Sequence, residues 1–311
     1  MHASITKPIT IALLALFLGS TRAGAALVIN EIHYHPYGAS GTGEFVEILN
    51  HSDSPVNLSG YRVSGGIDFT FPSGLYLAPH QSIVVVDDPS RFTNLQLDPP
   101  PLGPFQGRLS NSSDRLRLRN ASGTILDEVV YADRGFWPVA SDGHGPSLEL
   151  IHPNLPNHFA SAWAPAFQSG GSPGSPNSTF MPSPPPAVGD VLHSPTFPTA
   201  DQPILVLAQI QGISPLHPQP VLLVRDPYMT DDWAEFAMFD DGAHADLQPN
   251  DHIYGASIPA GFSSSPLLEF KLRTTGSTGA QSLFPATNER FTCLIPIGPE
   301  PPASQIGRAH V

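Results

Sequence analysis

Apolar and polar residues alternate in short runs through the first half of the chain, with the period of two that is typical of half-buried β-strands. Strands are expected at 28–34, 44–49, 61–63, 69–71, 83–86, 115–119, 124–131 and 147–151. Asn120 to Gly123 supplies a hairpin turn between two of them, and the Pro-rich stretch 98–107 is expected to be a loop. Beyond the first 25 residues no stretch sustains a 3.6-residue period, so the sequence predicts an all-β protein.

A second group of strand signals follows at 204–210, 221–224, 234–238, 254–258 and 267–273. Between the groups, residues 170–187 read GGSPGSPNSTFMPSPPPA, a composition that predicts an extended, semi-stiff linker. The spacing of the short strands predicts two immunoglobulin-like β-sandwiches. We therefore expect a leader at 1–25, a first sandwich at 26–177, a linker at 178–188, an immunoglobulin- or fibronectin-like sandwich at 189–297, and a linker with a tail at 298–311.

The leader has the pattern of a secretory signal peptide. Lys7 precedes an apolar run at 9–18, and Ala23-Gly24-Ala25 offers a cleavage site of small residues. The apolar run is too short to span a bilayer, and no later segment is long and apolar enough to do so. The sequence therefore predicts an exported protein, secreted or held at the cell surface.

Charge narrows the range of partners. Without Lys7 and Arg22 of the leader, 12 basic residues face 27 acidic ones, a formal net charge of −15. Such a surface repels nucleic acid and anionic lipid and suits calcium or a positively charged partner surface. Cys293 is the only cysteine, so no intrachain disulfide can form, a situation that favours bacterial export.

The first strand-rich region resembles a lamin-tail domain. The resemblance rests on the opening LVINEIHYHP at 27–36, EFVEILN at 44–50, VNLSGY at 56–61, SDRLRL at 113–118 and the closing GSPN at 174–177. It implies an immunoglobulin-like β-sandwich that binds other macromolecules or organises exported bacterial multidomain proteins. It implies no catalytic residue and no required cofactor.

The second region resembles a module that often follows the lamin-tail domain, through MFDDGAHAD at 238–246 and YGASIPA at 254–260. In related architectures a spore-coat-H-type kinase-like domain comes next. The sequence therefore suggests a non-catalytic pair of binding or scaffolding modules, whose partners are other proteins or cell-envelope or extracellular polymers. The alternative is the accessory region of an enzyme whose kinase-like or hydrolytic domain lies beyond Val311.

The last six residues, IGRAHV at 306–311, can be encoded by a sequence that resembles the start of a sequencing adapter. A natural polar tail is the alternative. Because the Pro-rich stretch before them is typical of a linker into a further domain, we expect the native reading frame to continue.

An Asp-rich loop is the main candidate for a metal site. Its oxygen-bearing side chains could present several ligands to calcium, with Gly242 allowing a sharp turn; they are Asp240, Asp241, Asp246, Asn250 and Asp251. Alternatively, the same side chains accept hydrogen bonds from local backbone amides in a tight turn. The spacing is not that of an EF-hand, so both interpretations stay open.

Two strand faces offer further candidates. Glu31, His33 and His35 share one face and could hold zinc, or Glu31 could instead bond a neighbouring loop. Arg115, Arg117 and Arg119 line another face, either as a stripe for an acidic ligand or as the solvated side of a hairpin.

The sequence contains none of the short motifs of hydrolase nucleophiles, phosphate-binding loops, zinc proteases or dinucleotide-binding folds. Cys293 lies in an apolar run at 291–295, where a buried and inert thiol is expected. No catalytic residue is predicted for this chain.

Overall fold

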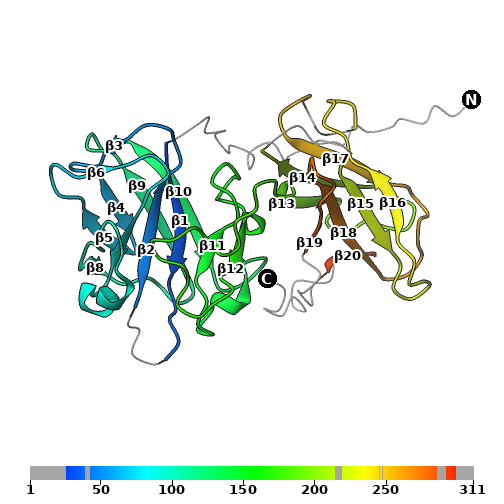
Figure 1. Cartoon of the computed structure of the whole chain (residues 1–311). Helices are drawn as coiled ribbons and strands as arrows, with labels where there is room; N and C mark the ends of the chain where they lie inside the picture. The colour runs from blue at the N-terminus through cyan, green and yellow to red at the C-terminus, as the bar shows by residue number, and fades with distance from the viewer. Residues whose placement is uncertain are drawn as a thin grey trace, which may run out of the picture.

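β-Strands dominate the computed structural model, which describes residues 26–38, 43–213, 219–244, 246, 248–285 and 292–298. The predicted signal peptide and almost all of the predicted tail lie outside these residues. Two β-sandwiches lie side by side (Figure 1), one built from β1 to β12 and the other from β13 to β20. The predicted all-β fold class is confirmed.

The first sandwich packs two five-stranded sheets. The first sheet has the order β12-β11-β1-β2-β7, the second sheet has the order β10-β9-β4-β5-β8, and β3 pairs with β6 beside them. Every strand pair in both sheets is antiparallel. The strands are β1 (Leu27–His33), β2 (Phe45–Asn50), β3 (Val56–Asn57), β4 (Arg62–Gly65), β5 (Ile67–Thr70), β6 (Tyr76–Leu77), β7 (Ser82–Val86), β8 (Gln106–Gly107), β9 (Ser113–Arg119), β10 (Ile125–Ala132), β11 (Leu148–Leu150) and β12 (Trp163–Pro165).

The second sandwich pairs a three-stranded sheet, β13-β14-β17, with a sheet of order β16-β15-β18-β19 in which β20 also pairs with β18. Its strands are β13 (Ala187–Ser194), β14 (Ile204–Gln211), β15 (Val221–Arg225), β16 (Ala234–Ala237), β17 (Ile253–Ile258), β18 (Leu267–Thr275), β19 (Gln281–Phe284) and β20 (Cys293–Pro296). The helices are short 3₁₀ turns: η1 (Pro89–Leu95), η2 (Val139–Ser141) and η3 (Ala160–Ala162). None of the helices in the described residues is long and apolar enough to cross a membrane.

Alternation along the strands places one set of side chains in each core. Val46 and Ile48 of β2 meet Leu116 and Leu118 of β9 in the first core, and all four are fully buried. The burial of these two leucines agrees with the period of two in the strand expected at 115–119. Each such side chain contributes about 1.5–3 kcal/mol relative to an exposed one.

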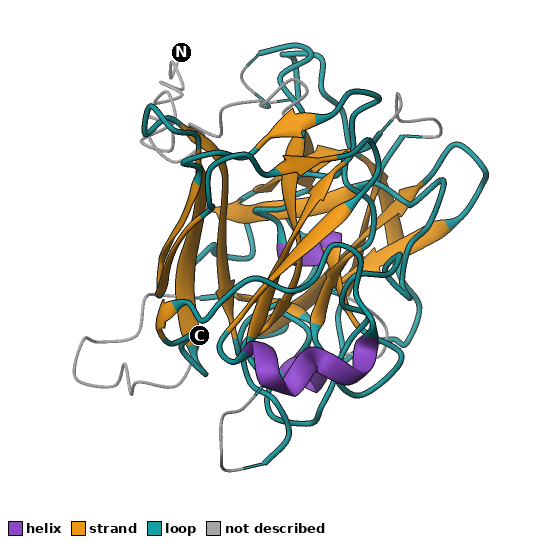
Figure 2. Cartoon of the chain, turned by 60° about the vertical axis from the view of Figure 1, so that its left-hand side comes forward, coloured by secondary structure: helices purple, strands orange, loops and turns teal. Residues whose placement is uncertain are grey.

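The other face of the first sheet is also covered. Phe92 of η1 packs edge-on against Phe45 of β2, with ring centroids 5.9 Å apart, and joins Val84 and Val86 in a small apolar cluster. Figure 2 shows η1 as the helical turn against the sandwich. Residues 172–179, which we call the closing segment, cover the rest of this face through hydrogen bonds described below.

The predicted linker at 178–188 differs from the expected extended spacer. Thr179, Pro184 and Pro186 are buried, and β13 already begins at Ala187. The hydroxyl of Ser161 donates to the carbonyl of Val188 at 2.7 Å and accepts from its amide at 2.8 Å. Buried side chains and these hydrogen bonds thus hold parts of the segment in place.

A ring contact adds to the junction between the sandwiches. Phe136 lies 4.4 Å, between ring centroids, from Phe284 of β19. Gly189 approaches Phe159 so closely that an added Cβ would lie 2.2 Å from the ring. The two sandwiches therefore contact each other directly.

One small element was missed in the region predicted as a loop. Gln106 and Gly107 form β8, which pairs with β5 in the register Ile67 to Gly107. Two residues are too few for a periodic signal, so only the partner strand identifies them.

Candidate functional site

A row of three glutamates crosses the outer face of the first sheet. Glu31 of β1 lies opposite Glu47 of β2 on one side and opposite Glu149 of β11 on the other. All three side chains are fully buried. Charged groups are rarely buried without partners, so their hydrogen bonds decide what the row does.

The closing segment supplies those hydrogen bonds. The amide of Ser172 donates to Glu31 at 2.8 Å, and its hydroxyl donates to Glu149 at 2.6 Å. The amide of Gly174 donates to Glu47 at 2.6 Å, and the amide of Thr179 donates to Glu149 at 2.9 Å. The glutamate row therefore fastens a segment far along the chain onto the sheet.

Glycine at position 171 makes this approach possible. Its φ of +73° favours glycine, and an added Cβ would lie 2.0 Å from Oε1 of Glu31. The second glycine of GGSPGSPN thus has a steric reason.

An asparagine pair connects the opening motif to the closing one. Asn30 donates through Nδ2 to Oδ1 of Asn177 at 2.8 Å, and Asn177 donates to the carbonyl of Leu150 at 2.8 Å. Asn30 also donates to Glu47 at 2.8 Å. The family-like motifs at the two ends of the domain are therefore neighbours in space.

Burial shifts the acidity of the row. Loss of solvent, followed by the charge of Glu47, raises the pKa of Glu31 to about 8. Loss of solvent also raises the pKa of Glu47 to about 7. Two of the three carboxyl groups thus carry protons well above the ordinary pH range of a glutamate.

Beside the glutamate row, a groove of about 690 Å³ opens to solvent. Its walls come from the turn after β2, the turn between β6 and β7, the segment after β11 and the closing segment. We call it the side groove. Its size is in the range of small-ligand sites.

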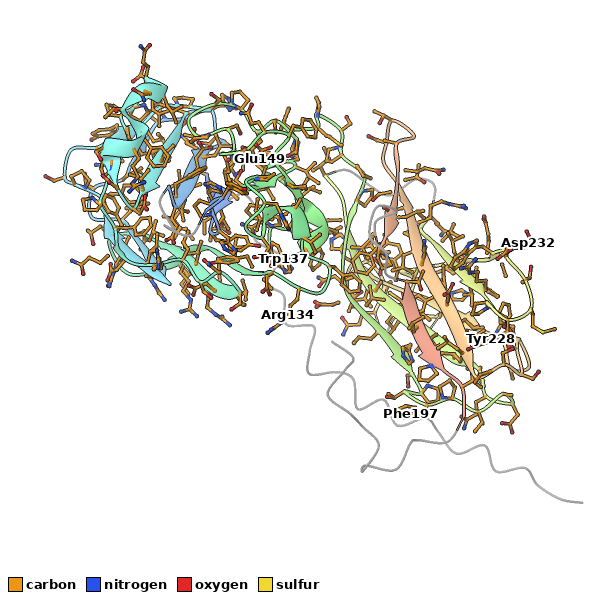
Figure 3. All side chains as sticks on the ribbon, turned by 90° about the horizontal axis from the view of Figure 1, so that it is seen from below. Arg134, Trp137, Glu149, Phe197, Tyr228 and Asp232 are labelled. Atoms are coloured by element: carbon orange, nitrogen blue, oxygen red, sulfur yellow. The ribbon has the colours of Figure 1, made fainter. Side chains whose placement is uncertain are left out.

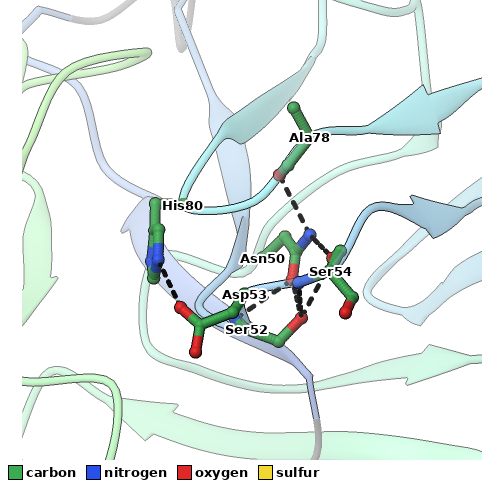
Figure 4. Close-up of polar contacts among 6 residues, drawn as sticks. All are labelled: Asn50, Ser52, Asp53, Ser54, Ala78 and His80. Atoms are coloured by element: carbon green, nitrogen blue, oxygen red, sulfur yellow. Dashed lines mark hydrogen bonds and ion pairs between the residues drawn. The ribbon is translucent and has the colours of Figure 1, made fainter.

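Asn50 holds two of these walls together (Figure 4). Its side-chain amide donates to the carbonyls of Ser54 and Ala78, each at 2.9 Å. His80 lines the groove and pairs with Asp53 at 3.0 Å. The rim of the groove is therefore built by hydrogen bonds between separate turns.

The opposite rim carries two stacked rings. His152 and Phe180 lie 5.5 Å apart between ring centroids, with planes 19° from parallel. Phe180 remains 47% exposed although burial of its ring would be favourable. The structure thus presents a partly exposed aromatic ring beside polar groups.

The carboxylates of the predicted metal loop accept hydrogen bonds mainly from backbone amides of the same loop. Asp240 accepts from the amides of Asp251 and His252, at 3.1 and 3.0 Å, and Asp246 accepts from Gly242 at 2.8 Å. The other oxygen of the fully buried Asp246 has no hydrogen-bond partner in the described residues. Burial, with the charges of Asp240 and Asp246, raises the pKa of Asp251.

Two further members of that set, Asp241 and Asn250, also lie in turns. Asp241 accepts from the amide of Ala243 at 2.9 Å, and Asn250 has a φ of 61°. Among the described residues no group of three or more His, Cys, Asp or Glu side chains is placed to hold a metal ion. Both interpretations of this loop, a calcium site and a turn held by its backbone amides, stay predictions.

The residues considered for zinc do not converge. Glu31 bonds Ser147 at 2.5 Å and the closing segment, whereas both ring nitrogens of His33 lie 3.0 Å from backbone carbonyls, those of Gly43 and Gly145. His35 pairs with Asp142 at 2.6 Å. The expected bond from Glu31 to a neighbouring loop is confirmed.

The arginine stripe is partly neutralised. Arg115 and Arg117 both bind the carboxylate of Glu128 on β10, at 3.0 and 2.5 Å. Arg119 donates to the carbonyl of Gly123 at 3.0 Å. Both interpretations of the stripe, a site for an acidic ligand and the solvated face of a hairpin, stay predictions.

A second hollow, of about 600 Å³, lies in the second sandwich. Trp233 lies under the guanidinium of Arg225, 4.7 Å from its ring centroid, in this hollow. Figure 3 shows Tyr228 and Asp232 at the end of this sandwich that is remote from Glu149. Cys293 is half-buried, and burial raises its thiol pKa to about 12, as expected of an unreactive thiol.

Sequence reasoning missed the glutamate row and the side groove. The alternation in EFVEILN predicts that Glu47 leaves the core face, but it carries no information about the segment that covers the other face. His152 and Phe180 stand outside any periodic run. The one available signal is the clustering of Ser, Gly and Asn in the closing segment, residues that commonly donate to carboxylates.

Comparison with known proteins finds similarity in part of the chain. A search of curated proteins gave no match. Among solved structures, two variants of the exo-chitosanase CsxA of Amycolatopsis orientalis, each in complex with PNP-beta-D-glucosamine, match at 12% identity, with TM-scores of 0.19 and 0.18. They cover 80% and 78% of this chain, which spans 26% and 25% of theirs, and these scores carry no argument.

The family model described as Lamin Tail Domain matches residues 20–133. This match supports the resemblance drawn from the sequence motifs. The observed sheet extends beyond the match, because β11 and β12 complete it and the closing segment covers it. Over residues 20–133 this chain is therefore similar to the lamin tail domain, a family of non-catalytic, immunoglobulin-like domains.

Proposed function

We propose that the chain is a pair of binding and spacing sandwiches in an exported, bacterial, multidomain protein. The match to the lamin tail domain carries this proposal. It is supported by the first sandwich, whose buried carboxyl groups bind its own closing segment. Those groups stabilise the fold, and the side groove beside them is open to a partner.

Direct binding assays test the central claim. The mature chain, fixed to a biosensor, should bind saturably to a cell-envelope or extracellular polymer or to a cell-surface protein from a defined panel. If variants with substituted groove residues still bind, the partner binds to another surface of the two sandwiches. No binding across the panel would contradict the proposed function.

Export needs a separate test. Residues 1–25 fused to a reporter phosphatase that is active only outside the cytoplasm should give activity in a bacterial host. A reporter without its leader serves as the control. Equal and low activity in both would contradict export.

The genomic reading frame beyond codon 305 separates the proposal from its alternative. A kinase-like or hydrolytic domain there would make these sandwiches accessory parts of an enzyme. A native stop codon or a surface-anchor signal would favour a protein whose role is binding alone.

A further inference from the structure

The side groove combines a flat ring surface with free hydrogen-bonding groups. The amide of Asn154 and the carboxylate of Asp98 both line the groove, and neither side chain makes a hydrogen bond within the described part of the chain. His152 and Phe180 supply the stacked rings. A ligand that fits this groove must therefore be apolar on one face and polar at its edges.

Backbone bonds hold the rings in place. The amide of Phe180 donates to the carbonyl of Asn177 at 3.0 Å, and the next amide, that of Met181, donates to Ile151 at 3.1 Å. Asn177 is itself buried and tied to Asn30. The platform is thus anchored to the first sheet before any ligand binds, which lowers the entropy cost of binding.

The tautomer of His152 is defined by a neighbouring amide. The N–H of Asn154 donates to Nδ1 of His152 at 3.1 Å, so a neutral ring carries its proton on Nε2. Burial, with the nearby His51, lowers the pKa of His152, and the neutral ring is favoured near pH 7. The ring then offers one donor and no charge.

Charge excludes two classes of ligand. No Lys or Arg lines the groove, and the chain has a net charge of −13, so an anionic ligand gains no partner there. Two carboxylates line the groove: Asp98 is exposed, where an ion pair contributes little, and the buried Glu47 already accepts hydrogen bonds from Asn30 and Gly174. The side chains of the groove therefore provide no strong site for an anion or for a cation.

We propose that the side groove binds a neutral, hydroxyl-rich carbohydrate, with one pyranose ring on the His152–Phe180 platform. The C–H groups on one face of a pyranose are slightly positive and are attracted to the negative face of an aromatic ring. Its hydroxyls donate and accept at the ring edge, where Asn154, Asp98 and Nε2 of His152 are available. This inference rests on the proposed binding function and names its ligand class.

The experiment measures binding of defined hexasaccharides to the mature chain by ligand-observed NMR and calorimetry. The neutral probes are β-1,4-linked glucose, xylose and N-acetylglucosamine and α-1,4-linked glucose, each tested up to about 10 mM. The charged probes are β-1,4-linked glucosamine and α-1,4-linked galacturonate. We expect a neutral probe to bind more tightly than both charged ones.

Variants locate the binding. Phe180→Ala and Asn154→Ala should each weaken the bound neutral probe, the first by about tenfold or more, because both side chains lie at the rim. Phe167→Ala is the matched control, since Phe167 is 82% exposed and does not line the groove. The thermal transitions of all three should match that of the wild type.

Three outcomes would overturn the inference: no neutral probe binds, a charged probe binds best, or Phe180→Ala binds as the wild type does. If proteins from the panel bind while all sugars fail, only the carbohydrate inference falls. If the whole panel fails, the proposed function falls with it.

Discussion

Glu31 and Glu47 face each other across adjacent strands of the first sheet, fully buried, and each accepts a backbone amide from the closing segment. Two like-charged groups at this separation repel when both are ionised. Because burial favours the neutral form of both groups, we expect the stability of the first sandwich to depend on their protonation.

That dependence predicts a fall in stability as pH rises. The pKa of Glu31 is raised to about 8 and that of Glu47 to about 7, above the ordinary value of 4.5. Between the ordinary and the raised pKa values the folded state therefore holds more protons than the unfolded chain does. The free energy of unfolding should fall from about pH 5 to pH 8, by on the order of a few kcal/mol from these groups.

Burial lowers the pKa of His33, which acts in the opposite sense near pH 6.5. To isolate the contribution of Glu31, the free energy of unfolding by urea is therefore measured for the wild type and for Glu31→Gln at pH 5 and at pH 8. In the variant the free energy of unfolding should fall much less between these two pH values. Parallel pH curves for wild type and variant would contradict the assignment.

The hydroxyl of Ser172 should stabilise the first sandwich. Ser172→Ala leaves Oε1 of the buried Glu149 without its 2.6 Å donor, which costs about 1–3 kcal/mol. Ser175→Ala is the matched control, because that side chain is exposed in the same segment. Equal urea midpoints for the two variants would show that the segment contributes no such bond.

Close packing at the junction can be measured by a double-mutant cycle. Gly189→Ala would place a Cβ 2.2 Å from Phe159, an overpacking cost of about 1–3 kcal/mol. In the background of Phe159→Ala the same change should cost much less, because the ring is gone. Additive effects of the two substitutions would contradict direct contact between β13 and the first sandwich.

The Asp-rich loop should behave as a turn held by its backbone amides. Asp240→Ala removes the acceptor of two amides and should lower stability by about 1–2 kcal/mol, whereas Asp232→Ala, at an exposed site, should not. Because backbone amides already bind oxygens of Asp240, Asp241 and Asp246, Tm should be the same with calcium and with chelator. A rise in Tm with calcium that Asp246→Asn abolishes would instead establish an ion site.

The arginine stripe should contribute little to recognition of acidic ligands. Arg115 and Arg117 already share Glu128, so alanine at 115, 117 and 119 should leave binding of polyglutamate unchanged. Affinity electrophoresis at low salt is the most sensitive assay, since such contacts are screened by ions. If the triple variant loses a mobility shift that the wild type shows with polyglutamate, the prediction is wrong and the stripe is a binding surface.

Local patterns determined most of the fold. The alternation in 115–119 places Leu116 and Leu118 inward, and the strands expected at 204–210, 221–224 and 267–273 are observed within a few residues of those bounds. A strand period depends only on neighbours along the chain, so one sequence suffices to detect it. The lamin-tail motifs could be recognised for the same reason, because each is a short local run of residues.

Only the tertiary structure decided what covers the outer face of the first sheet. Period two places Glu31, Glu47 and Glu149 away from the core, yet they are buried because a segment 141 residues from Glu31 in the chain binds them. The side groove exists for the same reason, since its walls are turns that lie far apart in the sequence. Contacts at such separations depend on how the whole chain packs, and no local pattern encodes them.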